Sequence, residues 1–300
     1  MRTVKIDELD FFIHGKNHYL LEVAGERLPI TTISGGSGER ICFTAGQHGN
    51  EWNGIRTLLL LREKLPEKIN GTIIILPTIN PPAFLLKQRT GPDGIDMNRI
   101  YPDHMESNTG RLGNLLYSKI FEKHDYLIDI HSGGPGTFIP HVRVPKEEDV
   151  HYGRYFLFEH IWVRLEKEGL IAPTIRKLGV RSCTIEIGGG RRVEIEIVEK
   201  CLHGLLNFLK KRGVIPGHFR EPGNYEIYHN RVIPKVEHMG FLKVAVKLGD
   251  KVEKGQVIAM LKRFEPGDEK ILTSPCEGTV GYVRREAAVV PGDSVIHIFT

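Results

Sequence analysis

The sequence predicts an α/β domain with a mixed, mostly parallel sheet, followed by a small domain built only of strands. Short runs of β-branched residues alternate with segments whose apolar residues recur every three or four positions, a pattern typical of buried parallel strands joined by helices. The helical period stops near Pro216-Gly217 and Glu221-Pro222-Gly223, and such pairs mark loops. We therefore expect an α/β domain at residues 1–220 and a β-domain at 221–300.

The elements of the first domain follow from local patterns. Residues 71–77 are an apolar run rich in β-branched residues, and residues 52–65 carry apolar side chains at helical spacing before Pro66. Residues 87–108 form a long polar segment, and such a long loop inside a compact domain is usually functional or disordered. On the same criteria we expect two or three strands within 4–33 with turns at Gly15 and Gly25, strands at 41–45, 126–131, 160–163 and 182–187, and helices at 110–123, 146–158, 171–178 and 193–212.

The second domain contains a Gly-Asp-x-Val unit twice, at 249–252 and 292–295. Such half-repeats resemble those of biotinyl/lipoyl carrier domains, which are small β-sandwiches. Carrier domains present a modified lysine in a hairpin, usually beside methionine or acidic residues. The corresponding hairpin, residues 261–270, has extra residues and lacks that setting, so we expect a sandwich of lipoyl-like type without carrier function.

Composition and charge exclude several classes of function. The formal net charge of +4 arises from Lys and Arg interspersed with Asp and Glu, which is not the pattern of a nucleic-acid or membrane surface. The N-terminus has no apolar stretch of signal-peptide length, and the four cysteines lie far apart without a CxxC pair. We expect a cytoplasmic protein with a small-molecule substrate, no nucleic-acid or membrane partner, and an oligomeric state that is open, a homo-oligomer included.

Residues 41–54 combine a strand, a tight turn and a helix start. The apolar run from Ile41 passes through Gly46, and Glu51 follows His48 at the start of the expected helix. An imidazole and a carboxylate on one such turn can bind Zn²⁺, which takes His nitrogen and Glu oxygen as ligands. The alternative is that Glu51 is a helix-start carboxylate favoured by the helix dipole and that His48 is an ordinary loop histidine.

A third ligand candidate, His131, lies at the carboxyl end of the expected strand 126–131. Side chains from the carboxyl ends of strands in an open sheet converge in one crevice, where such sheets bind ligands. Asp129, two positions earlier, points to the same side of the strand and is a plausible partner for the imidazole N–H. The alternative is a buried His–Asp pair with a structural role only.

Glu186 lies in an otherwise apolar strand directly before three glycines. A carboxylate is costly to bury there unless it is paired or serves as a catalytic base. As a general base, Glu186 would take the proton of the attacking water and pass it to the leaving amine. The alternative is a strand-end glutamate whose head group lies in solvent.

The long polar loop supplies candidates for substrate binding. Asn98 and Arg99 can hold a substrate carboxylate, because a planar guanidinium binds carboxylates through two hydrogen bonds. Arg89 on the same loop is a candidate for polarising the scissile carbonyl. The alternative for each arginine is an ordinary solvated loop side chain.

Four motifs resemble, in order, those of the succinylglutamate desuccinylase/aspartoacylase family of the zinc carboxypeptidase-like superfamily. The resemblance covers nearly the whole chain and implies a three-layer zinc carboxypeptidase-like domain that holds one Zn²⁺ per chain. The motifs are His48-Gly49-Asn50-Glu51, Asp96-Met97-Asn98-Arg99, Asp129-Ile130-His131-Ser132 and Thr184-Ile185-Glu186-Ile187.

The resemblance also implies residue roles. It implies zinc ligands at His48, Glu51 and His131, a general base at Glu186, carboxylate binders at Asn98 and Arg99, and an oxyanion partner at Arg89. In aspartoacylases an arginine shortly before the catalytic glutamate reads the substrate's side-chain carboxylate, a role for which Arg176 and Arg181 compete here. The sequence departs from the family at Tyr101-Pro102-Asp103, where Phe-Pro-Gly is common, and the segment between His131 and Glu186 looks short.

We therefore expect a zinc-dependent amide hydrolase that removes an acyl group from an N-acyl amino acid or a similar small carboxylate. One alternative is a metallocarboxypeptidase that acts on short peptides with the same groups. Another is a non-catalytic zinc-binding scaffold whose β-domain binds a partner.

Overall fold

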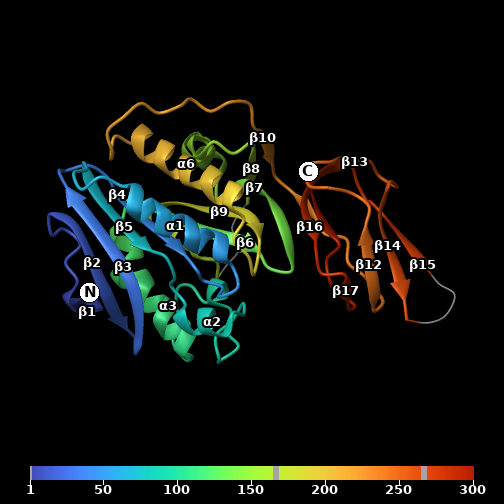
Figure 1. Cartoon of the computed structure of the whole chain (residues 1–300), viewed down its shortest axis with the longest axis horizontal. Coiled ribbons are helices and arrows are strands. Elements are labelled where there is room, and N and C mark those ends of the chain that lie inside the picture. The colour runs from blue at the N-terminus through green and yellow to red at the C-terminus, as the bar shows by residue number, and fades with distance from the viewer. Residues whose placement is uncertain (1, 165–168, 265–268) are drawn as a thin grey trace.

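The computed structural model describes residues 2–164, 169–264 and 269–300. One large mixed sheet runs through both parts of the chain (Figure 1), in the strand order β1-β2-β3-β5-β4-β6-β9-β7-β16-β18-β11, with β8, β10 and β13 beside this path. The strands of the first part are β1 (Arg2–Lys5), β2 (Gly15–Val23), β3 (Glu26–Gly35), β4 (Arg40–Ala45), β5 (Gly71–Leu76), β6 (Tyr126–Gly133), β7 (Gly136–Val144), β8 (His160–Val163) and β9 (Arg181–Gly189).

Helices join these strands. They are α1 (Trp52–Lys64), α2 (Pro81–Leu86), α3 (Asn108–Lys119), α4 (Val150–Gly153), α5 (Ile171–Arg176) and α6 (Ile195–Lys211), with short 3₁₀ turns at Ile6–Glu8, Met97–Arg99, Phe121–Lys123, Glu147–Asp149 and Arg154–Phe156. No helix among the residues described is long and apolar enough to cross a membrane.

The centre of the sheet is parallel. β5, β4, β6 and β9 are neighbours in this order and all run in the same direction. Antiparallel pairs flank them, β3 with β5 on one side and β7 with β9 on the other. The expected mixed α/β sheet is therefore confirmed, with its longest parallel part at the centre, where the carboxyl ends of the strands share one edge.

Helices cover both faces of this centre, which makes three layers (Figure 1). Side chains alternate between the faces along β4, as the pleat of a strand requires. Phe43 packs in one cluster with Leu58 of α1 and Phe208 of α6, whereas Cys42 packs in another with Leu116 of α3. All five side chains are fully buried. Burying a Leu or Phe side chain contributes roughly 1.5–3 kcal/mol, so these two layers hold the sheet in place.

The sequence patterns did not predict β7. Its residues Pro140, His141 and Arg143 interrupt the apolar run that identifies a buried strand. In the structure β7 nevertheless pairs with β9, β8 and β16. It is therefore the strand that joins the central sheet to the C-terminal part of the chain.

Two further elements differ from expectation. α2 begins at Pro81-Pro82, where a helix needs no backbone N–H donors, and the Asn80 side chain accepts a hydrogen bond from the Ala83 N–H as its cap. Residues 146–158, expected as one helix, contain only α4 between two 3₁₀ turns.

The C-terminal part adds a small antiparallel sheet in the order β15-β14-β12-β17. Leu242, Leu261 and Val280 belong to the apolar core between this sheet and the end of the large one. The tip of the expected hairpin, residues 265–268, lies outside the residues described. The strands are β10 (Glu226–Tyr228), β11 (Arg231–Val232), β12 (Gly240–Val244), β13 (Lys251–Val252), β14 (Val257–Arg263), β15 (Glu269–Thr273), β16 (Gly278–Arg284), β17 (Ala288–Val289) and β18 (Ile296–Phe299).

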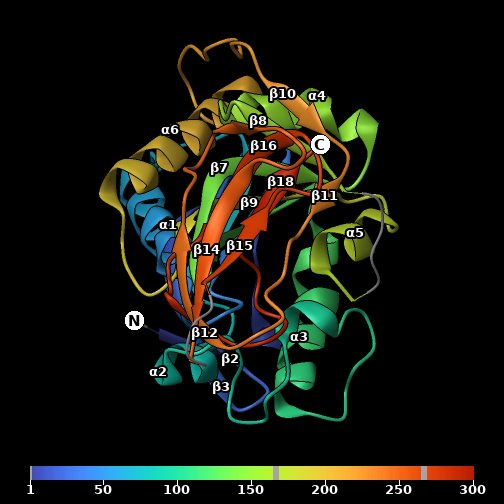
Figure 2. The ribbon, with the colours of Figure 1, turned by 90° about the vertical axis from the view of Figure 1, so that its right-hand side faces the viewer.

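Strands of the C-terminal part also extend the central sheet. β16 pairs with β7, and β10 pairs with β8, and Figure 2 shows β16 lying beside β7. The expected boundary at residues 220 and 221 lies between α6 and β10 and stays a prediction, as does the lipoyl-like character of the C-terminal sandwich.

His124, after α3, makes the stability of the fold depend on pH. It is buried, and its Nδ1–H donates to the Ile120 carbonyl at 2.7 Å. Burial lowers the pKa of His124 from 6.5 to about 4, although the hydrogen bond to Ile120 opposes the change. The unfolded chain therefore binds more protons between these values, so stability due to neutral His124 is present above pH 6.5 and is lost as the pH falls through 4.

We expect the free energy of unfolding of the His124→Asn variant to fall less than that of the wild type between pH 7 and pH 4. The difference approaches about 3 kcal/mol, because each pKa unit corresponds to about 1.4 kcal/mol. Urea unfolding at pH 7, 5.5 and 4 measures it. Parallel pH dependences in the two proteins would contradict this account of His124.

Candidate metal centre and substrate cavity

The carboxyl ends of β4, β6 and β9 lie at one edge of the sheet. Predicted site residues follow β4 and lie near the ends of β6 and β9. After β4 the chain turns through Gly46, whose φ of +65° only glycine adopts readily. His48 and Glu51 follow, and Glu51 directly precedes α1. His131 lies near the end of β6, and its register partner on β9 is Glu186. The parallel register thus brings together residues that are far apart in the sequence.

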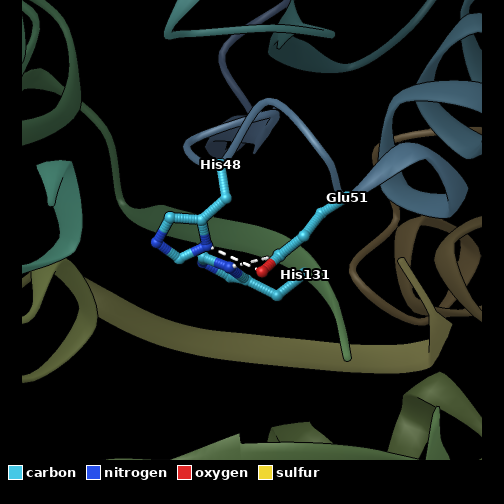
Figure 3. A group of neighbouring side chains, drawn as sticks. All are labelled: His48, Glu51 and His131. Atoms are coloured by element: carbon cyan, nitrogen blue, oxygen red, sulfur yellow. Dashed lines mark hydrogen bonds and ion pairs between the residues drawn. The ribbon is translucent and has the colours of Figure 1, made fainter. Parts of the chain in front are cut away.

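The side chains of His48, Glu51 and His131 point toward one another (Figure 3). His48 Nδ1 lies 2.8 Å from Glu51 Oε1, and His131 Nδ1 lies 2.9 Å from Glu51 Oε2. The Ser132 backbone N–H donates to Glu51 Oε2 at 2.9 Å. All three side chains are buried, and one ligand atom from each lies within 4.8 Å of the others. Three potential metal ligands therefore converge on one point.

Each imidazole of this cluster has a second carboxylate partner. His48 Nε2 lies 3.0 Å from Asp96 Oδ1, and His131 Nε2 lies 2.6 Å from Asp129 Oδ2. Asp129 also accepts a hydrogen bond from Thr44 Oγ1 at 2.8 Å. With each Nε2–H directed at a carboxylate, each Nδ1 remains for the shared centre, as is typical of metal-binding histidines.

The cluster favours positive charge at its centre. Burial alone would raise the pKa of Glu51, but His48 and His131 hold that pKa well below its ordinary value. Burial also acts to raise the pKa of Asp96, and the hydrogen bond from His48 together with Arg89 lowers it instead. For His131 burial would lower the pKa, yet Asp129 and Glu51 raise it well above its ordinary value. Ionised carboxylates in this buried place attract a cation.

The donor set suits Zn²⁺. Catalytic zinc sites commonly use three protein ligands drawn from His and carboxylate groups, and Mg²⁺ and Ca²⁺ prefer oxygen ligands only. A tetrahedral ion with bonds of about 2.0–2.1 Å holds its ligand atoms roughly 3.3 Å apart. The separations of 2.8 and 2.9 Å between the imidazole nitrogens and Glu51 are slightly shorter. A small outward movement of the rings therefore accommodates the ion.

A cavity of about 320 Å³ adjoins the cluster and is strongly cationic. Burial, together with the neighbouring arginines, lowers the pKa of Arg164 to about 10 and that of Arg231 to about 9. Guanidinium groups that repel one another in this way form a site that attracts anions. The arginines that line the cavity are Arg89, Arg99, Arg143, Arg164 and Arg231.

Glu186 lines the same cavity and is 6% exposed. Arg143 Nη1 lies 2.7 Å from Glu186 Oε1. Glu186 Oε2 is buried and has no hydrogen-bond partner within the described part of the chain. One carboxylate oxygen is thus held by a guanidinium, and the other is available to a ligand or to water.

The structure brings Arg89, Asn98 and Arg99, the predicted substrate-binding residues of the long loop, to this cavity. Arg89 Nη2 binds Asp96 Oδ2 at 2.8 Å, and Arg89 Nη1 lies 3.4 Å from His48 Nδ1. Asn98 Oδ1 accepts a hydrogen bond from the backbone N–H that begins α5, at 3.1 Å. The loop that carries these residues therefore contacts both His48 and the start of α5.

The structure does not bring Arg176 to the cavity lining described, and the same holds for Arg181. Arg176 Nε lies 3.1 Å from both carboxylate oxygens of the buried Asp149. Arg181 Nη1 donates to the Tyr126 hydroxyl at 2.8 Å. Both guanidinium groups are therefore engaged by partners that do not line the cavity.

The sequence reasoning missed several residues in and beside the cavity. Asp96, which contacts His48 and Arg89, belongs to a motif that was found, but it received no role. Arg143 lies on the unpredicted strand β7, and Arg164 and Arg231 lie far apart in the sequence with no local motif. The alternation of His141 and Arg143 with apolar residues was the available signal, because it places both polar side chains on one face of a strand.

Comparison with known proteins identifies a family and a relative of known name. The chain matches the family model of the succinylglutamate desuccinylase/aspartoacylase catalytic domain over residues 37–212. It is 30% identical over 249 residues to the N-alpha-acetyl-L-2,4-diaminobutyric acid deacetylase of Halomonas elongata, a match that covers 77% of this chain and 73% of that protein.

Solved structures share the fold over almost the whole length. The product-bound ectoine utilization protein EutE of Ruegeria pomeroyi superposes with a TM-score of 0.89 at 22% identity and covers 97% of both chains. A succinylglutamate desuccinylase/aspartoacylase from Rhodobacter sphaeroides gives a TM-score of 0.85 at 24% identity, over 97% of this chain and 98% of that one.

We expect the Asp129→Asn variant to bind zinc about 10–100-fold more weakly than the wild type, because the amide no longer fixes the His131 tautomer as a carboxylate does. Competition with a chromophoric zinc chelator measures the affinity. The matched control is Asp149→Asn, which changes a buried aspartate that pairs with Arg176 instead. Equal zinc affinity in Asp129→Asn and wild type would exclude this role for Asp129.

Proposed function

Because the chain belongs to the succinylglutamate desuccinylase/aspartoacylase family, we propose that it is a zinc-dependent amide hydrolase that removes the acyl group from an N-acyl amino acid or a similar small carboxylate. The observation that carries the proposal is the convergence of His48, Glu51 and His131 beside Glu186 in a cationic cavity. The relative from Halomonas elongata, a deacetylase by name, supports the class of reaction.

In this proposal His48, Glu51 and His131 hold one Zn²⁺. When bound, the ion supplies a Lewis acid that lowers the pKa of water and polarises an amide carbonyl. Asp96 and Asp129 keep the two imidazole rings oriented, because each accepts the hydrogen bond of an Nε2–H.

Glu186 is the proposed general base. Arg143 occupies Oε1, so Oε2 receives the proton of the attacking water and returns it to the leaving amine. The placement of Glu186 opposite His131 in the register of β6 and β9 supports this role, because it sets the base beside a metal ligand.

The loop residues bind and polarise the substrate. Arg89, whose Nη1 lies 3.7 Å from Glu51 Oε1, is next to the ligand cluster and donates to the developing oxyanion. Asn98 and Arg99 hold the carboxylate of the substrate, for which a planar guanidinium is suited. Exposure of nearly half of the Arg99 side chain leaves it free to reach a ligand.

The charge of the cavity bears on the substrate. The name of the Halomonas elongata relative specifies a diaminobutyric acid, whose side chain carries an amine. Arg143, Arg164 and Arg231 line the cavity of the present chain and repel a second cation. We therefore propose that the side chain and acyl group of its substrate are neutral or negatively charged.

The C-terminal part, residues 221–300, is proposed as a second domain that narrows the cavity to small substrates. Arg231, Tyr282, Ser294 and His297 from this part line the cavity. These side chains narrow the cavity and leave little room for a polypeptide. The narrow cavity favours a deacylase over a carboxypeptidase.

A hydrolysis screen tests the proposal. Zinc-loaded protein is incubated with N-acetyl and N-succinyl amino acids and with dipeptides, and release of free amine is measured. Hydrolysis of an N-acyl amino acid in preference to dipeptides is expected. Preference for dipeptides would support a carboxypeptidase, and zinc binding without hydrolysis of either class of substrate would support the non-catalytic zinc-binding scaffold.

We expect the Glu186→Gln variant to retain one zinc ion per chain and to lose turnover by about 10²–10⁴-fold, because a general base contributes a factor of this size. Metal analysis and the free-amine assay are the measurements. Glu39→Gln is the control, because Glu39 pairs with Arg212 and precedes the amino end of β4, at the opposite edge of the sheet. Turnover of zinc-loaded Glu186→Gln at the wild-type rate would rule out Glu186 as the base.

A further inference from the structure

β7 carries a hydrogen-bonded chain of side chains that ends on the proposed base. Arg143 Nη1 lies 2.7 Å from Glu186 Oε1, and Arg143 Nε donates to His141 Nε2 at 3.0 Å. His141 Nδ1 in turn lies 2.7 Å from the Ile139 carbonyl. The register explains the chain, because His141 on β7 lies directly opposite Glu186 on β9. Two residues farther along, Arg143 points to the same face of β7 as His141.

The protonation of His141 follows from its surroundings. The residue is fully buried. Burial, followed by the charge of Arg143, lowers the pKa of His141 well below its ordinary value, although the Ile139 carbonyl opposes this. A neutral ring that donates through Nδ1–H to the carbonyl has a lone pair on Nε2. That lone pair can accept only from a donor such as Arg143 Nε–H.

Aromatic rings and hydrogen bonds surround the Arg143 guanidinium, except at Nη2. Its guanidinium carbon lies 5.1 Å from the ring centre of Phe138 and 5.0 Å from that of Trp162. Its Nη2 is buried and has no hydrogen-bond partner in the described part of the chain, and the same is true of Glu186 Oε2. Both residues line the cavity. The chain therefore leaves one donor and one acceptor available to a bound substrate or water.

We propose that His141 is a positioning residue for the hydrolysis. By accepting the Arg143 Nε–H, it orients the guanidinium so that Nη1 holds Glu186 Oε1 and Oε2 stays free to move the proton. This inference rests on the proposed deacylase function and assigns a role to a strand and a histidine that no motif identified. His141 is not among the residues that line the cavity, and in this role it acts through Arg143.

Two substitutions separate the two ring nitrogens of His141. In His141→Asn the amide N–H can still donate to the Ile139 carbonyl, but no acceptor reaches Arg143. In His141→Gln an amide oxygen can take the place of Nε2. We expect kcat to fall about 10–100-fold in His141→Asn, which is the usual effect of removing a residue that orients a functional side chain through a hydrogen bond. KM changes little, and one zinc ion per chain is retained. His141→Gln recovers most of kcat.

The control is His124→Asn, because His124 is also a buried neutral histidine whose Nδ1 binds a backbone carbonyl, but it lies outside the cavity. Its kcat stays at the wild-type value. A double-mutant cycle adds a second readout: in an Arg143→Gln background, His141→Asn has no further effect on kcat, because the guanidinium that it positions is gone. In ¹⁵N-labelled protein, the Arg143 Nε–H resonance shifts in His141→Asn and not in His124→Asn.

The outcomes distinguish this inference from the function on which it rests. Wild-type protein without hydrolysis of any N-acyl amino acid would overturn the proposed function and this inference together. An active wild type whose kcat is unchanged in His141→Asn, or an additive double-mutant cycle, would overturn this inference alone. If His141→Asn does not fold, the comparison of His141→Gln with Arg143→Gln tests the inference instead. An equal loss of kcat in these two variants would overturn the inference, because an acceptor in the place of Nε2 would then have no effect.

Discussion

The buried carboxylate of Glu51 is the constraint on which the rest of the structure depends. An ion removed from water in this way costs several kcal/mol unless opposite charge and hydrogen bonds compensate it. Two imidazole nitrogens and the Ser132 backbone N–H face the carboxylate at 2.8–2.9 Å. Compensation is possible only because β4 and β6 run parallel and end at the same edge, so that a turn after one strand meets the end of the other. The three-layer packing of the sheet therefore determines the geometry of the cluster of His48, Glu51 and His131.

Outside this cluster the cavity has an excess of positive charge. Its arginines outnumber its carboxylates, and burial, followed by repulsion from Arg143 and Arg164, lowers the pKa of Arg231 to about 9. Trp162 relieves part of this repulsion, since the guanidinium carbons of Arg143, Arg164 and Arg231 lie 4.6–5.3 Å from its ring centre. Arg231 belongs to the C-terminal part of the chain, which reaches the site through the pairing of β16 with β7. The folded chain therefore leaves an excess of positive charge in this cavity.

Sequence reasoning identified the candidates that the structure brings together where each lies in a recognisable local pattern. His48 and Glu51 lie on one turn, and His131 and Glu186 lie near the ends of apolar strands, so spacing and strand type were sufficient to bring them together as candidates. It failed where the position of a side chain depends on residues that are distant in the sequence. Arg176 precedes Glu186 at a plausible distance, but the buried Asp149 binds its side chain, and no pattern in the sequence indicates that pair. β7 was missed because His141 and Arg143, which lie beside Glu186, interrupt the apolar run by which a buried strand is recognised.

The central claim is that one zinc ion lies among His48, Glu51 and His131. Anomalous diffraction at the zinc absorption edge, from crystals of protein loaded with one equivalent of zinc, tests it most directly. The account predicts a single anomalous peak within about 2.0–2.2 Å of Nδ1 of both histidines and of a Glu51 carboxylate oxygen. A peak at another place on the molecule, with none between these three side chains, would contradict it.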